Sequence, residues 1–297
     1  MAFREQLIHG PEGRVLEVAT MGDPGGHTVF FHHGTPGSTK TMLAFESLAE
    51  DARLFFVTAS RAGYGASSRR EGRNVASVVG DTRFALDTLG RATYVSFGWS
   101  GGGPHALACA ALDAPRCVKA VTLASVAPSD VDFDWSEGMG PENLEEFALA
   151  KEGGLAYETY MEASCNIMAE IDEDNVIELM TGLLAEADRE VLGDDQAREI
   201  FATGISYGFA HDWRGYFDDN VAFLEPWGFD PSTIDVPVAL YFGDADLMVP
   251  PAHGLWFADH LSTASPHRHA PDGHLSIYAR HLDEVASDLA SAFEAQC

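Results

Sequence analysis

A serine flanked by glycines follows a predicted strand and precedes a predicted helix. The stretch Gly98-Trp99-Ser100-Gly101-Gly102 comes after an apolar run that ends at Phe97. Glycines two positions before and two positions after the serine permit a sharp strand-to-helix turn that exposes the hydroxyl. The first amides of the helix point at the same place, so the Gly101 N–H is a candidate donor to an oxyanion. The pattern predicts nucleophilic chemistry at Ser100.

A serine hydroxyl is a weak nucleophile, so it needs a base, and the base needs an orienting carboxylate. Candidates for both occur later in the chain, each after a predicted strand. Asp244 and Asp246 follow a strand at residues 236–242, and His274 follows a short strand near Arg268. The chain therefore carries serine, aspartate and histidine in an order compatible with a catalytic triad.

The elements that must position these residues alternate between short β-branched runs and helical runs, which is typical of β-α-β units and a mostly parallel sheet. Ligands bind such sheets at the carboxyl ends of the strands. The sequence thus predicts an α/β fold with a mostly parallel sheet of about eight strands flanked by helices. Candidate strands lie at residues 15–20, 28–31, 54–59, 93–97, 118–124 and 236–242 and near Arg268, and candidate helices at 42–51, 75–90, 102–111, 253–260 and 283–296.

The segment of residues 128–232 differs from the rest of the chain in charge and in pattern. It contains 26 of the 46 acidic residues and only four of the 18 lysines and arginines, in a chain of net charge −28. Its apolar residues recur at helical spacing and few strand-like runs occur. We predict a helical insertion at 128–232 in a core domain formed by 1–127 and 233–297.

Composition narrows the classes of partner. With 297 residues, 46% hydrophobic and 22% charged, the chain has the make-up of a folded globular protein. The negative charge disfavours nucleic acid and anionic membrane surfaces, and we expect a neutral or cationic small-molecule substrate. Without a secretory pattern or a long apolar run, we expect a cytoplasmic protein. A solvated surface, adaptation to high salt and a funnel for cationic substrates are three explanations of the acidity; the oligomeric state is not predicted.

Together these motifs resemble the α/β-hydrolase superfamily, in particular its capped serine hydrolases, in which a helical cap follows the sixth strand. The resemblance covers essentially the whole chain. His33-Gly34-Thr35-Pro36-Gly37 is similar to the oxyanion loop, the turn at 243–246 to the acid loop, and Gly273-His274 to the base. One departure is Ser60, which stands before Arg61 where the family has an acid, so we expect a weakened ion pair at Arg61.

The resemblance implies Ser100 as nucleophile, His274 as general base and then acid, and Asp246 as the carboxylate, with Asp244 and Asp130 as alternatives. It implies an oxyanion hole made by the backbone N–H groups of Thr35 and Gly101. The expected activity is hydrolysis of a small-molecule ester through an acyl-enzyme. A proline iminopeptidase-like aminopeptidase and a non-catalytic ligand-binding protein are the alternatives.

We expect structural rather than catalytic roles for the other notable histidines. His32 and His33, like His267 and His269, form pairs that could suggest a metal, but no carboxylate stands at ligand spacing. We expect the first pair to hydrogen-bond the oxyanion loop and the second pair to be exposed to solvent. His105 is expected to pack rather than to act as a second base. The sequence predicts neither a metal ion nor a cofactor.

Overall fold

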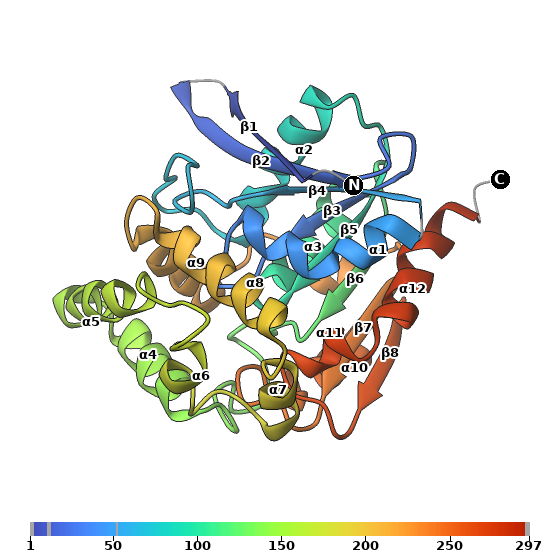
Figure 1. Ribbon diagram of the computed structural model, residues 1–297. Coiled ribbons are helices and arrows are strands. Elements are labelled where there is room, and N and C mark those ends of the chain that lie inside the picture. Colours follow the sequence, from blue (N-terminus) through green and yellow to red (C-terminus); the bar gives the residue numbers. More distant parts are fainter. Residues whose placement is uncertain (1–2, 11–12, 52, 295–297) are drawn as a thin grey trace.

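An eight-stranded sheet forms the centre of the computed structural model, which describes residues 3–10, 13–51 and 53–294 (Figure 1). The strand order is β1-β2-β4-β3-β5-β6-β7-β8. β2 runs antiparallel to both of its neighbours, and the remaining pairs are parallel. The predicted mostly parallel sheet is confirmed. The strands are β1 (Arg4–His9), β2 (Val15–Gly22), β3 (His27–His32), β4 (Leu54–Ala59), β5 (Tyr94–Trp99), β6 (Cys117–Leu123), β7 (Val238–Gly243) and β8 (Ala264–His269).

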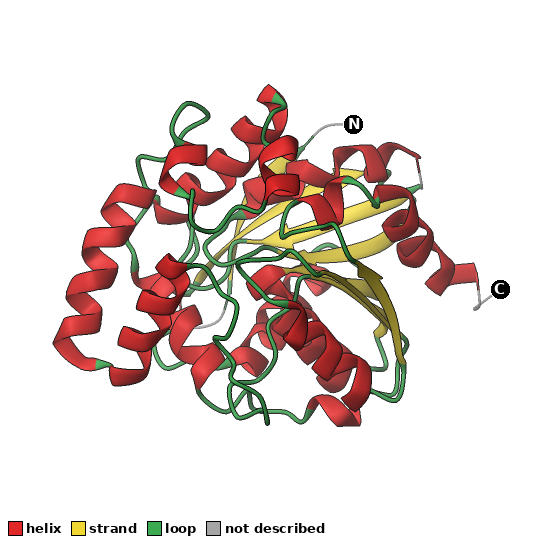
Figure 2. Ribbon diagram, turned by 90° about the horizontal axis from the view of Figure 1, so that it is seen from below, coloured by secondary structure: helices red, strands yellow, loops and turns green. Residues whose placement is uncertain are grey.

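Helices cover both faces of the sheet (Figure 2). Apolar side chains of α1 (Glu46–Asp51) and α12 (Leu282–Glu294) join one core cluster, and those of α2 (Val78–Thr88), α3 (Gly103–Leu112) and α10 (Pro251–His260) join the other. β5 lies in the middle, and all six of its residues are buried. Because both faces of β5 are covered, its residues do not alternate between buried and exposed as those of a half-exposed strand do.

Six α-helices and two 3₁₀ turns lie between β6 and β7 along the chain, and the helices cover residues at the carboxyl edge of the sheet (Figures 1 and 2). We call residues 128–232 the inserted segment. Many of its buried side chains continue the core cluster that includes Phe31 and Phe97 of the sheet, and others, among them Phe147 and Phe223, join the second cluster. The helices are α4 (Pro141–Glu152), α5 (Gly154–Met168), α6 (Val176–Leu179), α7 (Glu186–Val191), α8 (Asp195–Ser206) and α9 (Arg214–Leu224), with η5 (Tyr207–Phe209) before α9.

Five short elements complete the described chain. They are η2 (Thr39–Phe45), η3 (Val75–Ser77), η4 (Ser100–Gly102), η6 (Pro231–Thr233) and α11 (Ser276–Ala279). η4 and α11 matter most for the site, because η4 begins at the predicted nucleophile and α11 begins two residues after the predicted base. None of the described helices is long and apolar enough to cross a membrane.

Two sequence-based boundaries differ from the structure. The helix predicted at 42–51 is a 3₁₀ turn followed by the short helix α1. The edge strand β1 was not among the candidate strands, because five of its six residues are exposed and only Ile8 is buried, so it carries little of the hydrophobic pattern that marks a strand. The end of the helix predicted at 283–296 falls on residues 295 and 296, which lie outside the described residues.

Candidate active site

Ser100 occupies a strained turn between β5 and η4. Its backbone φ is +57°, in the left-handed region that residues with a Cβ rarely adopt. The glycines around it are sterically required: a Cβ on Gly98 would lie 2.4 Å from the Gly102 carbonyl oxygen, and a Cβ on Gly102 would lie 2.0 Å from that of His32. The surrounding residues hold the turn in this strained conformation. Strained backbone of this kind is often found at functional sites.

The two residues predicted to form an oxyanion hole lie next to each other at this turn. A Cβ on Gly101 would lie 2.3 Å from the Thr35 Oγ1 atom, so the loop after β3 packs directly on η4. Thr35, Gly101 and Ser100 line one pocket. The structure therefore places these three residues side by side, and their action as an oxyanion hole stays a prediction.

Asp246 contacts the predicted base. Its Oδ2 atom accepts a hydrogen bond from His274 Nδ1 at 2.8 Å, and its Oδ1 atom accepts bonds from the backbone N–H groups of Met248 and Val249, each at 2.8 Å. Both side chains are buried. The alternatives are elsewhere: Asp244 pairs with Arg268, and Asp130 is exposed. Of the three candidate acids, Asp246 is the one in contact with His274.

The environment of His274 favours its charged form. Burial by itself lowers the pKa of His274, but the charge and hydrogen bond of Asp246 and the charge of Asp188 outweigh burial and raise this pKa above its ordinary 6.5. With Nδ1 held by Asp246, the nitrogen left to exchange a proton with a substrate is Nε2. The imidazole is thus oriented and made more basic.

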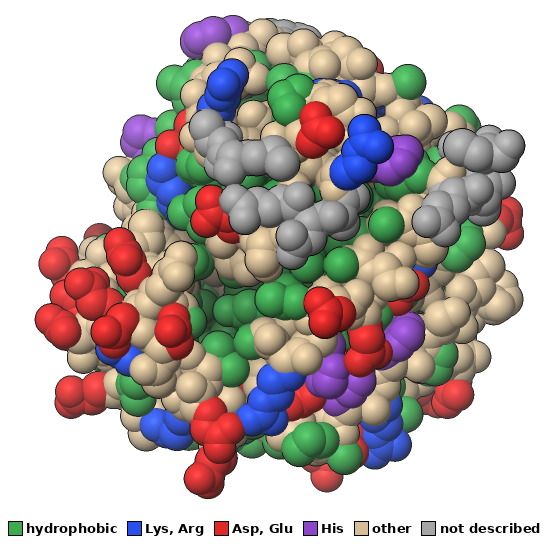
Figure 3. All heavy atoms as spheres, turned by 45° about the vertical axis from the view of Figure 1, so that its right-hand side comes forward, with side chains coloured by type: hydrophobic (Ala, Val, Ile, Leu, Met, Phe, Trp, Pro, Cys, Tyr) green, Lys and Arg blue, Asp and Glu red, His purple; other side chains and the backbone are tan. Residues whose placement is uncertain are grey.

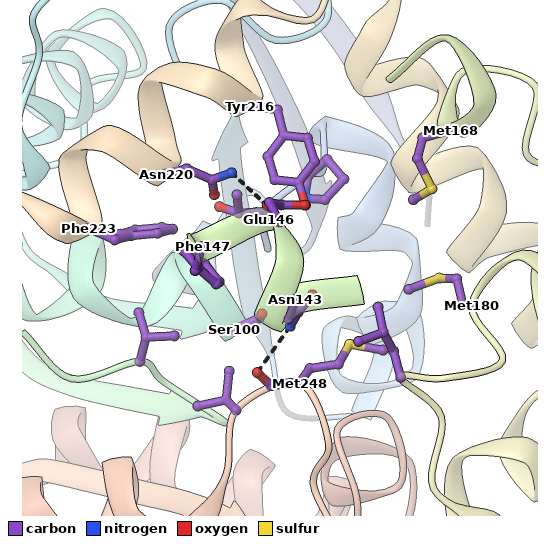
Figure 4. A pocket seen from close by; sticks show the side chains of 16 residues that line it. Ser100, Asn143, Glu146, Phe147, Met168, Met180, Tyr216, Asn220, Phe223 and Met248 are labelled. Carbon is purple, nitrogen blue, oxygen red and sulfur yellow. Dashed lines mark hydrogen bonds between the residues drawn. The ribbon is translucent and has the colours of Figure 1, made fainter. Parts of the chain in front are cut away.

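Two pockets meet at Ser100. The first runs under α4 and α9, where Glu146, Asn220 and Phe223 line it together with Gly101 (Figure 4). The second contains His274 and is closed by Trp99 and side chains of α8. Both pockets also share Thr35 and Met248. A substrate bound across Ser100 would therefore have one part beneath α4 and α9 and the other beside the imidazole.

Arg61 does not have the weakened ion pair that the sequence predicts, and the reason lies in the inserted segment. Asp219 of α9 accepts from Arg61 Nη2 at 2.6 Å and lies 2.5 Å from Arg73 Nη1. Burial alone would raise the pKa of Asp219, but the two guanidinium charges hold it well below its usual 3.8. Arg61 still has an acid partner, although that partner comes from far along the chain.

The ion cluster of Arg61, Arg73 and Asp219 is connected to the oxyanion loop. Arg61 donates to the carbonyl oxygens of His33 and Gly34 and, at 2.7 Å, to Thr35 Oγ1. The Thr35 hydroxyl in turn donates to Asp219 Oδ2 at 2.7 Å. The inserted segment therefore helps to fix the loop that carries one of the two predicted oxyanion donors.

Asp188 is a site residue that the sequence analysis missed. It is fully buried in α7 of the inserted segment, and its carboxylate accepts bonds from the backbone N–H groups of His274, Leu275 and Ser276, each at 2.9 Å. Gly273 permits this approach, because a Cβ there would lie 2.3 Å from Asp188 Oδ2. No local motif marks Asp188, which is one of 26 acidic residues in its segment.

The remaining histidines differ in their surroundings. His33 Nδ1 bonds to the Gly34 carbonyl oxygen and its Nε2 accepts from the backbone N–H of Arg61, so it supports the oxyanion loop. For His32 the expectation is wrong, because its Nε2 atom is paired with Ser96 Oγ of β5, at 3.1 Å. His105 is buried against Asp219, and burial lowers its pKa to about 4. The expectation of solvent exposure for His267 and His269 is wrong, because both are half-buried: His267 stacks on Tyr241 at 4.3 Å.

A group of His269, His281 and Glu284 has ligand atoms within 4.8 Å of one another. The two ring nitrogens of His281 are already engaged by Asp272 at 2.6 Å and Glu284 at 3.1 Å. The sequence pairs did not reveal this group, because His269 ends β8, His281 directly precedes α12 and Glu284 lies in the first turn of α12. The absence of a metal stays a prediction.

Comparisons with known proteins agree with the fold. Residues 27–145 match the family model described as alpha/beta hydrolase fold. An alpha/beta hydrolase fold protein from Nakamurella multipartita is 20% identical, with a TM-score of 0.69 over 97% of this chain and 99% of that one. An esterase from Rhodococcus sp. is 18% identical, with a TM-score of 0.68 over 97% of this chain and 100% of that one. A thermophilic esterase from Thermogutta terrifontis is 18% identical, with a TM-score of 0.66 over 99% of each chain. No match was found among the curated protein sequences. The chain has the α/β-hydrolase fold.

Proposed function

We propose that this protein is a serine esterase that cleaves a neutral or cationic small-molecule ester. The observation that carries the proposal is the shared pocket of Ser100 and His274, with Asp246 bonded to the far nitrogen of the imidazole. Two structural relatives of the same fold are esterases. We also propose that residues 128–232 act as a cap on a core domain of residues 1–127 and 233–297.

The proposed first step is attack of the Ser100 hydroxyl oxygen on the ester carbonyl carbon. His274 Nε2 takes the hydroxyl proton, and the carbonyl π electrons move to oxygen to give a tetrahedral oxyanion. The N–H groups of Thr35 and Gly101 stabilise that oxyanion, and each such donor is worth about 3 to 4 kcal/mol of barrier. Collapse of the intermediate expels the alcohol with the proton from His274 and leaves an acyl-enzyme.

The second step returns the enzyme to its starting state. His274, neutral again, removes a proton from water, which attacks the acyl carbon. The new tetrahedral intermediate releases the carboxylic acid and the Ser100 oxygen regains its proton. Because His274 lines the second pocket, that pocket holds the leaving alcohol and then the water. The first pocket, which contains Gly101, holds the acyl group.

Labelling with a fluorophosphonate tests the proposal, since this reagent reports an activated serine whatever the natural substrate. We expect stoichiometric labelling of the wild type and hydrolysis of short p-nitrophenyl esters. Ser100→Ala should remove labelling and lower kcat by a factor of about 10⁴ to 10⁶. Ser287→Ala, at an exposed position of α12, should keep both activities.

Absence of labelling in folded wild-type protein would favour a non-catalytic ligand-binding protein. Labelling together with hydrolysis of proline β-naphthylamide but of no simple ester would favour the aminopeptidase alternative. Wild-type rates in Ser100→Ala would overturn the assignment of the nucleophile.

A further inference from the structure

A buried carboxylate lies in the pocket beside Ser100 and has no part in the proposed ester chemistry. Glu146 of α4 is 7% exposed, and its side chain points into the pocket under α9 (Figure 4). Tyr216 OH donates to its Oε2 atom at 2.8 Å, and Asn220 Nδ2 donates to its Oε1 atom at 2.6 Å. Each oxygen therefore keeps a lone pair for another donor.

Glu146 has no cationic partner among the residues that the structure describes. Several other buried carboxylates do: Asp219 has Arg61, Asp218 has Arg69 and Asp272 has Arg280. A carboxylate buried without a counter-ion is unfavourable in its charged form. Burial accordingly raises the pKa of Glu146 to about 7, although the bonds from Tyr216 and Asn220 act in the opposite direction.

A second unsatisfied acceptor lies beside Glu146. Asn220 is 1% exposed and lines the same pocket, and its Oδ1 atom is buried without a hydrogen-bond partner. The orientation of its amide is fixed, because Nδ2 donates both to Glu146 and, at 3.0 Å, to Tyr157 OH. An amide oxygen buried in this way favours a ligand that brings its own donor.

Most of the other side chains that line this pocket are apolar. Phe147, Met168, Met180, Leu183 and Phe223 are among the side chains that line it. The titratable groups that interact with Glu146 are Tyr157, Tyr160 and Cys165 of α5 and Tyr216 of α9. Burial raises the pKa of each, so they are neutral near pH 7. A cation bound here would interact with the Glu146 charge in surroundings that screen it weakly.

We propose that Glu146 and Asn220 form a subsite for a protonated amine, and that the natural substrate is an ester whose acyl group carries that amine. The subsite lies in the pocket that contains Gly101 and not in the one that contains His274. The ammonium donates to Glu146 and to Asn220 Oδ1, and its charge keeps Glu146 ionised. The placement of the amine on the acyl group rests on the proposed esterase function. The amine subsite itself does not depend on that function.

The surface around the pocket agrees with a cationic ligand. Acidic side chains gather over the inserted segment, beside a hollow that exposes hydrophobic side chains (Figure 3). The segment has 26 acidic residues and four basic ones. A single-sign field of this kind attracts opposite charges and raises their rate of association at low salt.

Binding to a protein that cannot turn over separates the subsite from the chemistry. The titration uses Ser100→Ala protein, with n-hexylammonium and 1-hexanol as probes, followed by calorimetry at pH 8 and low salt. We expect the ammonium to bind at least tenfold more tightly than the alcohol. Adding Glu146→Gln should abolish that preference, whereas adding Glu145→Gln, at the exposed neighbouring position, should leave it intact.

A matched pair of substrates then places the amine on the acyl side. The p-nitrophenyl esters of 6-aminohexanoate and heptanoate have acyl chains of the same length and differ in a terminal ammonium or methyl group. We expect kcat/KM to favour the amino ester in the wild type by at least tenfold. Glu146→Gln should reverse this ratio, with heptanoate turnover retained, and Asn220→Ser should reduce the ratio several-fold.

The outcomes separate the two proposals. Equal binding of both probes, or a preference that survives Glu146→Gln, overturns the amine subsite while labelling of Ser100 leaves the esterase proposal in place. A Glu146-dependent preference in a protein that is never labelled overturns the esterase proposal and keeps the subsite. Should Glu146→Gln not fold, Asn220→Ser decides, because an unchanged ammonium preference in that variant counts against the subsite.

Discussion

The carboxylate of Asp188 accepts a hydrogen bond from the backbone N–H of His274 at 2.9 Å, across 86 positions of the chain. The same carboxylate accepts from the next two backbone N–H groups and from Ser276 Oγ. Asp188 therefore fixes the loop that carries the predicted base, whereas Asp246 fixes the imidazole itself. The charge of Asp188 also contributes to the raised pKa of His274.

Replacing Asp188 should affect both stability and the titration of His274. In Asp188→Ala three buried N–H groups lose their acceptor, and we expect a loss of about 2 to 4 kcal/mol in the free energy of unfolding. Asp188→Asn keeps an acceptor but removes the charge, so the pKa of His274 should fall and the acid limb of kcat/KM should move to lower pH. A pH-rate profile measures this shift. Glu186→Ala, exposed on the same helix, should change neither quantity, and an unmoved limb in Asp188→Asn would restrict Asp188 to a purely structural role.

The activity of the wild type should decline as the medium becomes acidic through the pKa of His274. The folded-state pKa of His274 is raised above 6.5, and only the neutral imidazole can accept the Ser100 proton. We therefore expect the midpoint of the kcat/KM profile above pH 6.5. By linkage, the charged His274–Asp246 pair stabilises the fold below pH 6.5, and that contribution is lost as the pH rises through the raised pKa.

Asp246→Asn should shift the midpoint of the kcat/KM profile to lower pH. Without the carboxylate, burial dominates and lowers the pKa of His274, while kcat falls by a factor of about 10⁴ because the imidazole loses its orientation. The rate of fluorophosphonate inactivation against pH measures both effects. Asp244→Asn serves as the control, since Asp244 pairs with Arg268; a large loss there and not at Asp246 would exchange the roles of the two aspartates.

Asp219→Asn should destabilise the fold strongly. Arg61 and Arg73 are each almost fully buried, and both depend on the Asp219 charge. Breaking a buried ion pair by removing one partner costs about 3 to 5 kcal/mol. The neighbouring Asp218 pairs with the more exposed Arg69, so Asp218→Asn should cost only about 1 kcal/mol. Denaturant unfolding compares the two variants, and equal losses would show that the ion cluster contributes no more than the partly exposed Asp218–Arg69 pair.

Glu146→Gln should stabilise the protein at high pH. The pKa of Glu146 rises from 4.5 to about 7 on folding, so the contribution of its protonated form is present below pH 4.5 and is lost as the pH rises through 7. The gain from Glu146→Gln should therefore grow between pH 5 and pH 8, up to about 3 kcal/mol. Thermal unfolding at both pH values, with Glu145→Gln as control, measures the difference. A gain independent of pH would mean that Glu146 is ionised throughout.

Local patterns were sufficient to predict the strands before Ser100 and Asp246, because β5 and β7 are buried along their whole length. The strand before His274 gave a weaker signal, since β8 has no fully buried residue, and its position was predicted only as a short strand near Arg268. The glycines at 98 and 102 carry steric information that a sequence reader can use directly. β1 carried no such signal, since its side chains are mostly exposed. The identity of the acid partner of Arg61 could not be predicted either, because 158 positions separate it from Asp219.

The roles of single acidic residues in the inserted segment could not be predicted from the sequence either. Its excess of acidic residues reads as a uniform property of the sequence, yet Glu146, Asp188 and Asp219 are buried and specific whereas most of the others are exposed. Charge and helical spacing do not tell these groups apart. Their roles follow only from which backbone amide, guanidinium or pocket each one reaches, and that depends on how α4, α7 and α9 sit against the sheet.

Asp188 and Asp219 tie one stretch of chain to both loops that flank Ser100, and Glu146 of the same stretch lines the binding cavity. Any exchange of residues 128–232 for the equivalent stretch of a relative, made to change substrate preference, would thus also remove the partners of Arg61 and of the turn at position 273. Substrate preference and the rigidity of the proposed reacting groups would therefore change together, and a transplanted segment would need two anchoring acids of its own.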